Sequence, residues 1–130
     1  MPPEDTGAAP PPGAVVLLAD LLLGSRVRDT LKRMSIRAEF PGSPPELEEA
    51  WRRPALLVIV DLSEGRLDPI GAIRRARGLG IPVLAFGSHV DRERLEAASA
   101  AGADTVVPRS TFASRLEELI SSLAGGEATA

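Results

Sequence analysis

The sequence predicts a doubly wound α/β domain, in which one five-stranded parallel sheet of order 2-1-3-4-5 has helices on both faces. Two observations predict this fold. Apolar runs alternate along the chain with stretches whose apolar residues recur every three to four positions. Asp20 and Asp61 directly follow the first and third apolar runs. In this strand order those two strands are neighbours, so the two carboxylates share one crevice at the carboxyl edge of the sheet.

The strands are predicted from the apolar runs and the helices from the stretches between and after them. The predicted strands span residues 14–19, 36–40, 56–60, 81–86 and 105–107. Each such strand must be followed by a crossover helix, because parallel neighbours are joined right-handedly. The last helix is predicted as one continuous amphipathic segment from Phe112 to Leu123.

Start and stop signals delimit three of the helices. Ser43 precedes two prolines and Glu46, which is the pattern of a capping box, and Asp68 precedes Pro69 in the same way. Ser88 is the predicted N-cap of a helix over residues 92–101, and Gly102 is its predicted stop.

The composition is that of one globular domain with an aliphatic core. The 130 residues are 44% hydrophobic and 25% charged, and only 3% are aromatic. The net charge of -3 offers no basic surface for nucleic acid or for an anionic membrane, so neither partner is expected. The chain has no cysteine, which excludes disulfides and thiolate metal sites. We expect a cytoplasmic protein.

The two ends of the chain differ in composition from the middle. Residues 1–12 include five prolines and two acids with little to bury, and residues 125–130 begin with two glycines. We therefore predict disordered tails over 1–12 and 125–130 around a single domain over 13–124.

Several stretches match one known family in order and spacing. They are 15–20, 57–63, Asp68-Pro69, 81–86 and 98–107. With these stretches, residues 14–123 resemble the receiver domain of bacterial response regulators, which has the flavodoxin-like (βα)5 fold. The resemblance implies that Asp61 is the phosphoacceptor. It also implies that Asp20, Asp61 and the Ser63 carbonyl would hold a magnesium ion, for which oxygen ligands are suitable.

The positions that depart from the receiver pattern are those that, in the family, bind the phosphoryl group or change conformation on activation. Ala19 stands where the first of two paired acids belongs, and Gly87 where a hydroxyl residue contacts the phosphoryl group, although Ser88 is adjacent. Arg109 replaces a lysine, and its forked guanidinium is not equivalent to an ammonium.

Two further departures lie around the fifth strand. Ser110 replaces the proline that normally follows a cis peptide bond, so the loop is expected to take another route, for example through Pro108. Val106 replaces the aromatic residue that reports activation.

Four other features have simple structural interpretations. We expect Glu64 to point into solvent, His89 to be a polar loop residue and Trp51 to be a packing residue on the second helix. The arginines of residues 74–77 are expected to form a solvated face, with an acidic protein partner as the alternative.

The resemblance and its departures favour a pseudo-receiver that acts as a protein interaction module in two-component signalling, without cofactor and without enzymatic activity. Its partner would be a signalling protein or a second copy, bound through the face of the fourth helix, fifth strand and fifth helix. The alternative is a working single-domain response regulator that a histidine kinase phosphorylates on Asp61 with magnesium. Further alternatives are a small α/β enzyme with an anionic ligand, and acids that only cap a helix or pair with Arg109.

Overall fold

The predicted strands form one parallel sheet in the order β2-β1-β3-β4-β5, which confirms the predicted fold. A computed structural model describes residues 12–124 of the chain. Its strands are β1 (Gly13–Leu17), β2 (Arg37–Glu39), β3 (Ala55–Asp61), β4 (Val83–Gly87) and β5 (Thr105–Pro108). The predicted tails lie outside the described residues, apart from Pro12.

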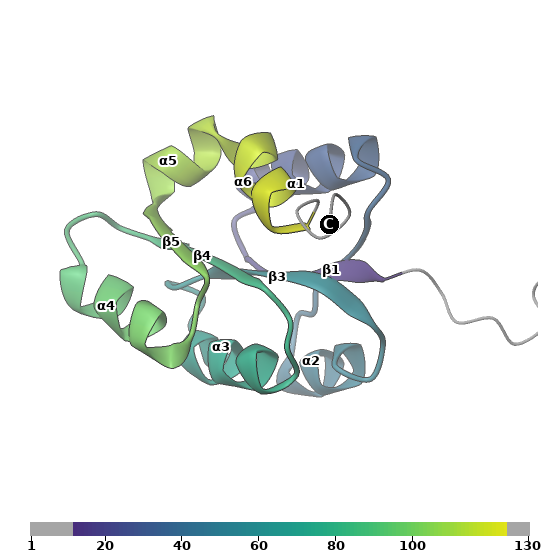
Figure 1. Cartoon of the computed structure of the whole chain (residues 1–130), viewed down its shortest axis with the longest axis horizontal. Coiled ribbons are helices and arrows are strands. Elements are labelled where there is room, and N and C mark those ends of the chain that lie inside the picture. The colour runs from purple at the N-terminus through teal and green to yellow at the C-terminus, as the bar shows by residue number, and fades with distance from the viewer. Residues whose placement is uncertain (1–11, 125–130) are drawn as a thin grey trace, which may run out of the picture.

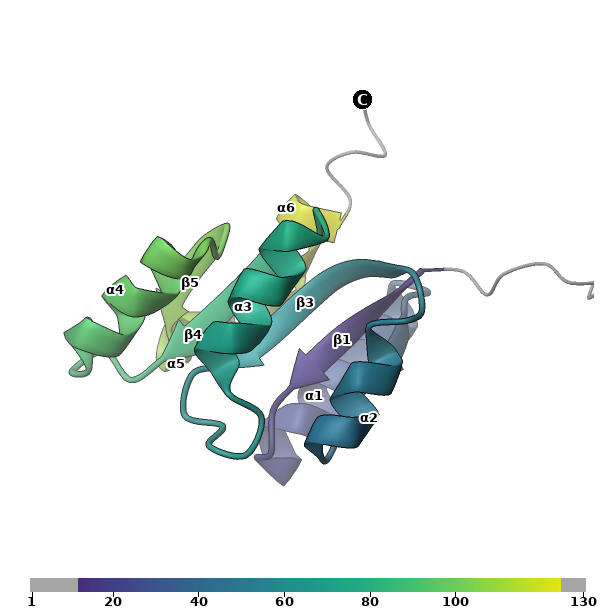
Figure 2. The ribbon, with the colours of Figure 1, turned by 90° about the horizontal axis from the view of Figure 1, so that it is seen from below.

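Six helices within the described residues cover the two faces of the sheet. They are α1 (Leu21–Arg33), α2 (Pro44–Ala50), α3 (Pro69–Gly78), α4 (Arg92–Ala101), α5 (Arg109–Ser114) and α6 (Leu116–Ala124). Figure 1 shows α1, α5 and α6 above the sheet and α2, α3 and α4 below it. In Figure 2 the lower face is seen directly, with α2 beside β1 and α3 beside β3 and β4. Among residues 12–124, no helix combines the length and hydrophobicity needed to cross a lipid bilayer.

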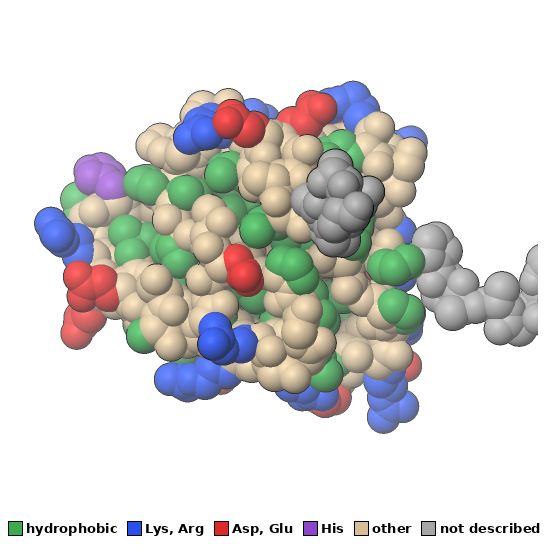
Figure 3. Space-filling model, in the orientation of Figure 1, with side chains coloured by type: hydrophobic (Ala, Val, Ile, Leu, Met, Phe, Trp, Pro, Cys, Tyr) green, Lys and Arg blue, Asp and Glu red, His purple; other side chains and the backbone are tan. Residues whose placement is uncertain are grey.

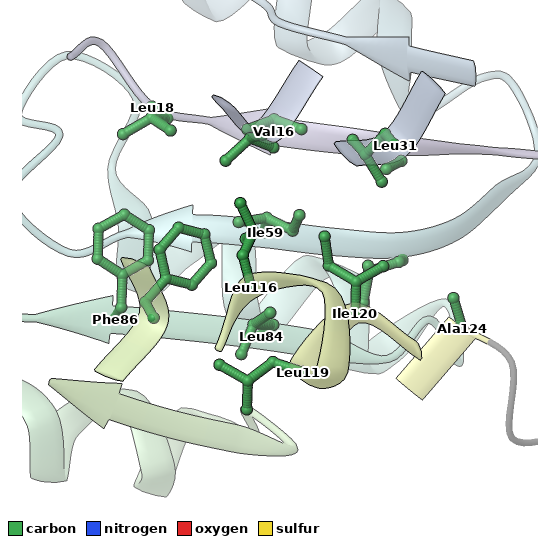
Figure 4. Close-up of a cluster of buried hydrophobic side chains, with 14 of the residues drawn as sticks. Val16, Leu18, Leu31, Ile59, Leu84, Phe86, Leu116, Leu119, Ile120 and Ala124 are labelled. Carbon is green, nitrogen blue, oxygen red and sulfur yellow. The ribbon is translucent and has the colours of Figure 1, made fainter. Parts of the chain in front are cut away.

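Each face of the sheet has its own aliphatic core. Val16 and Ile59 point to the upper face and pack against α1 and α6, and Figure 4 shows this cluster with Phe86 at one end and Ala124 at the other. Val58 and Val60 point to the lower face, where they pack with residues of α2, α3 and α4. The alternation along β3 follows from the two-residue period of a strand. Both clusters hold the carboxyl ends of β1, β3 and β4 in a fixed register.

The predicted helix starts are confirmed at two of three positions. Ser43 Oγ accepts a hydrogen bond from the Glu46 N–H at 3.3 Å, and Asp68 Oδ1 accepts one from the Gly71 N–H at 3.2 Å. The predicted N-cap Ser88 is wrong, because Asp91 caps α4 by accepting from the Arg94 N–H at 3.2 Å. An aspartate adjacent to the helix was the better cap by the same rule.

The last helix is not continuous as predicted. Arg115, with φ -125° and ψ 33°, lies outside the helical region and separates α5 from α6. The break allows Phe112 of α5 to stack on Phe86 of β4, with ring centres 4.0 Å apart, while Leu116 and Ile120 enter the core from α6. Periodicity alone did not reveal the break, because Phe112, Leu116 and Ile120 keep a four-residue spacing across it.

Candidate functional site

Asp61 is the last residue of β3 and lies at the carboxyl edge of the sheet, as predicted. It is paired in register with Phe86 of β4 and is only 5% exposed. Its Oδ1 accepts hydrogen bonds from the Ser63 N–H at 2.9 Å and from the Ser63 hydroxyl at 2.7 Å. These two donors hold Oδ1 in place. The other carboxylate oxygen, Oδ2, faces Arg109.

Asp20 lies after β1 and caps α1. Its Oδ1 accepts a hydrogen bond from the Leu23 N–H at 2.9 Å, and its side chain is 41% exposed. The Leu23 N–H lowers the pKa of Asp20, and the Arg109 guanidinium lowers it further. The carboxylate therefore has a local structural role at the helix N-terminus, whether or not it also binds a ligand.

Arg109 is the first residue of α5 and connects the two carboxylates. One guanidinium nitrogen lies 2.6 Å from Asp20 Oδ2, and another lies 3.5 Å from Asp61 Oδ2. The guanidinium carbon is also 5.6 Å from the centre of the Phe86 ring, which is itself stacked on Phe112. The aromatic pair and the two acids thus hold one cation at the carboxyl edge of the sheet, beside the ends of β1 and β3.

The oxygen donors around Asp61 do not fit a magnesium ion in this arrangement. Ala19 supplies no side-chain oxygen, and the guanidinium of Arg109 contacts both remaining carboxylates. Within residues 12–124, no group of three or more His, Cys, Asp or Glu side chains is placed to hold a metal. A hard cation prefers several oxygen ligands. Magnesium at Asp20, Asp61 and the Ser63 carbonyl would require Arg109 to leave.

Glu64 is buried, which corrects the expectation that it points into solvent. Its side chain is 1% exposed and lies 3.0 Å from the Arg66 guanidinium. It also accepts the Arg66 N–H at 2.7 Å, while Arg66 donates to the Gly42 carbonyl at 3.1 Å. The hydrogen bond from the Arg66 side chain lowers the pKa of Glu64 despite its burial. Glu64 therefore organises the loop after β3, and its charge is neutralised within that loop.

Comparison with known proteins identifies the fold. The chain matches no protein-family model and no curated protein sequence. It superposes on a response regulator receiver protein from Burkholderia phymatum with a TM-score of 0.72 and 24% identity, covering 88% of this chain and 95% of that one. The CheY-like receiver domain protein from Methanospirillum hungatei JF-1 gives a TM-score of 0.76 at 14% identity, covering 91% and 97%.

This chain has the receiver-domain fold. A response regulator from Thermotoga maritima, at 21% identity and a TM-score of 0.72, covers 88% of this chain and 98% of its own length. The receiver fold therefore accounts for all five strands described here and for the carboxyl edge of the sheet at which Asp20 and Asp61 lie. Sequence identities below 25% establish only the fold. The chemistry that the chain can perform depends on the side chains at the carboxyl edge of the sheet.

Gly87 ends β4 at the hydroxyl position of the receiver pattern, and apolar side chains crowd that position. A β-carbon built on Gly87 would lie 3.3 Å from Leu62 Cδ1 and 3.5 Å from Leu95 Cδ2. Ser88 does not take over the role in this arrangement, since its hydroxyl accepts the Val90 N–H at 3.3 Å within its own loop. Leu62, the residue after Asp61, fills this space, and the sequence pattern did not predict that position for it.

The remaining atypical receiver positions belong to the packing around β5. Val106 is half-buried and packs against the lower core. Pro108 ends β5 with φ -64° and ψ 155°, and Ser110 lies in the first turn of α5. No peptide bond among residues 12–124 is cis, so the chain enters α5 through an all-trans connection that includes Pro108.

Three further exposed side chains follow the ends of β1 and β4. His89 is exposed and borders a shallow pocket with Arg92 and Leu95 at the start of α4. Leu21 and Leu22, which sequence reasoning passed over, are 87% and 83% exposed beside Asp20. The signal was available, because the buried spacing of α1 begins at Leu23 and leaves both leucines off the core face.

Proposed function

We propose that this chain is an atypical receiver-like module that acts in signalling through protein contacts, and that ordinary phosphorylation of Asp61 does not control it. The observation that carries the proposal is the position of Arg109, whose guanidinium contacts both Asp20 and Asp61. An internal cation there satisfies the two carboxylates that a metal would otherwise need. The absence of an acid at Ala19 and of a hydroxyl at Gly87 supports the same conclusion. The proposed role is not enzymatic.

Incubation with acetyl phosphate and magnesium tests this proposal. We expect no magnesium-dependent phosphoryl mass increment in the intact protein. Asp61→Asn is the control for any adduct at other residues, and Arg109→Lys tests whether the guanidinium is the obstacle. A clear magnesium-dependent adduct that disappears in Asp61→Asn would overturn the proposal.

The second candidate is a working single-domain response regulator in a two-component system, with Asp61 as phosphoacceptor and magnesium at Asp20, Asp61 and Ser63. One observation favours it. Arg109 and Asp20 side chains are each 41% exposed, and the contact of Arg109 with Asp61 is long, at 3.5 Å. A half-exposed arginine can rotate into solvent at little cost. The acetyl phosphate experiment separates the two candidates directly.

The partner surface is proposed to lie on α4, β5 and α5. Val90, in the loop that leads into α4, is 75% exposed and offers an apolar contact. Val90→Ser should weaken self-association in analytical ultracentrifugation while Asp61→Asn leaves it intact. Leu79→Ser, at a 49% exposed leucine following α3, is the matched control. Equal association of all three variants would exclude Val90 from a homodimer interface.

A further inference from the structure

The lower face of the domain carries a groove between α2 and α3 that the proposed function does not use. It has a volume of about 440 Å³. Leu47, Trp51 and Ala72 contribute apolar lining, and Arg74 and Arg75 contribute cations. Asp68 also lines the groove, and its carboxylate accepts the Gly71 N–H at the start of α3. Figure 2 shows the two helices side by side on this face. An aromatic side chain with neighbouring cations is a surface suited to an apolar, acidic segment.

The charges along the groove are not all neutralised within the domain. Arg75 lies 5.7 Å from the Trp51 ring centre and pairs with Glu48 at 3.1 Å. Arg74, the residue before Arg75 in α3, is exposed. Arg52, the residue after Trp51, is also exposed. Figure 3 shows Lys and Arg side chains along the lower edge of the molecule, where Figure 1 places α2 and α3. An anionic occupant would gain from these cations.

The N-terminal end of β1 lies next to the Trp51 end of the groove. The Gly13 N–H donates to the Pro54 carbonyl at 3.4 Å, and Pro54 follows Trp51 by three residues. The chain that precedes Gly13 therefore joins the domain beside the aromatic end of the groove. In Figure 2, the end of α2 and the start of β1 come together at the same edge.

The sequence of that segment matches the chemistry of the groove. Residues 1–12 contain five prolines together with Glu4 and Asp5. Proline-rich segments favour the polyproline II helix and bind aromatic-lined grooves in that form. Seven residues in this conformation span roughly 20 Å at about 3.1 Å each, whereas a ten-residue helix such as α3 is about 15 Å long. The segment is therefore long enough to run the length of α3, on which Arg74 lies.

We propose that this groove binds the chain's own N-terminal segment, with prolines packed on Trp51 and with Glu4 and Asp5 beside Arg74. The contact is intramolecular, because the segment begins at the edge of the groove. Neither Asp61 nor Arg109 lines the groove, so the contact does not involve them directly.

Charge reversal in the full-length chain tests the contact. Trp51 is the only tryptophan, so its indole NMR signal and its fluorescence quenching by acrylamide report on the groove alone. In E4R/D5R we expect the indole signal and the amide signals of residues 47–51 and 71–75 to shift, and the quenching constant to rise. R74E should cause the same change, and E4R/D5R/R74E should move the signals back toward the wild type. E96R/E127R is the control with the same change in net charge.

Two results would overturn the proposal. If E4R/D5R leaves the Trp51 indole signal and its quenching at the wild-type and control values, the segment does not occupy the groove. If the wild-type signals move on dilution, the occupant is the segment of a second copy and the intramolecular contact is wrong. Neither readout depends on phosphorylation, so the outcome is separate from the test of the proposed function.

Discussion

Arg109 and Asp20 form a 2.6 Å ion pair that joins the start of α5 to the start of α1 across the carboxyl edge of the sheet. These residues are 89 positions apart in the chain, and their pairing brings a cation into the crevice that contains Asp61. The same guanidinium lies 3.5 Å from Asp61, so one side chain contacts both acids of the candidate site.

Placing an acid at position 19 and replacing the Arg109 guanidinium with an ammonium should create a metal site. In A19D/R109K, a second acid would stand beside Asp20, and a compact ammonium would replace the guanidinium that contacts both carboxylates. We expect magnesium affinity to rise by at least roughly tenfold, measured by isothermal titration calorimetry. Asp61→Asn in the same background should remove the gain. An unchanged affinity in A19D/R109K would show that Arg109 and Ala19 do not control metal binding.

The space at the end of β4 should resist a β-branched residue. Gly87→Thr would bring a β-carbon within 3.3 Å of Leu62, so we expect a loss of about 1–3 kcal/mol in unfolding free energy. The loss should be smaller in a Leu62→Ala background, which removes the Cδ1 atom at 3.3 Å and leaves only the Cβ of residue 62 at 3.4 Å. Urea denaturation of the wild type, Gly87→Thr, Leu62→Ala and the double variant gives the coupling free energy between the two substitutions. Additive effects would mean that Leu62 does not occupy the position of the missing hydroxyl.

Removing the partner of a buried acid should cost more than removing the partner of an exposed one. Arg66→Ala leaves Glu64, whose side chain is 1% exposed, without its guanidinium. Arg115→Ala breaks a comparable local pair with Glu118, whose side chain is 65% exposed. We expect Arg66→Ala to lower the unfolding free energy more, measured by urea denaturation. The reverse order would contradict the structural role given to Glu64.

Acid should weaken the domain partly through Asp20. The folded state lowers the pKa of Asp20 through the Leu23 N–H and Arg109. A lowered folded pKa stabilises the protein above the unfolded value, about 3.9, and that contribution is lost as the pH falls through the folded value. Asp20→Asn should therefore flatten the decline in unfolding free energy below about pH 4. Parallel pH profiles for the two proteins would show that Asp20 is not stabilised in this way.

Much of the fold could be predicted because local patterns and global packing agree. The alternation of apolar runs and helical spacings predicted a parallel sheet with crossover helices, for which 2-1-3-4-5 is a common strand order. Asp20 and Asp61 were correctly placed at one edge of that sheet. Ser43, Asp68 and Gly102 delimit helices by contacts within a few residues, which sequence alone reveals.

Tertiary structure decided the features that depend on contacts distant in the chain. Glu64 is buried because Arg66, in the loop after β3, pairs with it. Arg66 also donates a hydrogen bond to the carbonyl of Gly42, which lies 24 residues before it in the chain. The helix break at Arg115 accompanies the stacking of Phe112 on Phe86, and the periodicity of the sequence encodes neither. The sequence alone determined that two acids meet in a receiver-like crevice. Only packing determined that Arg109 lies between them, because its direction depends on Phe86, Asp20 and Asp61 together.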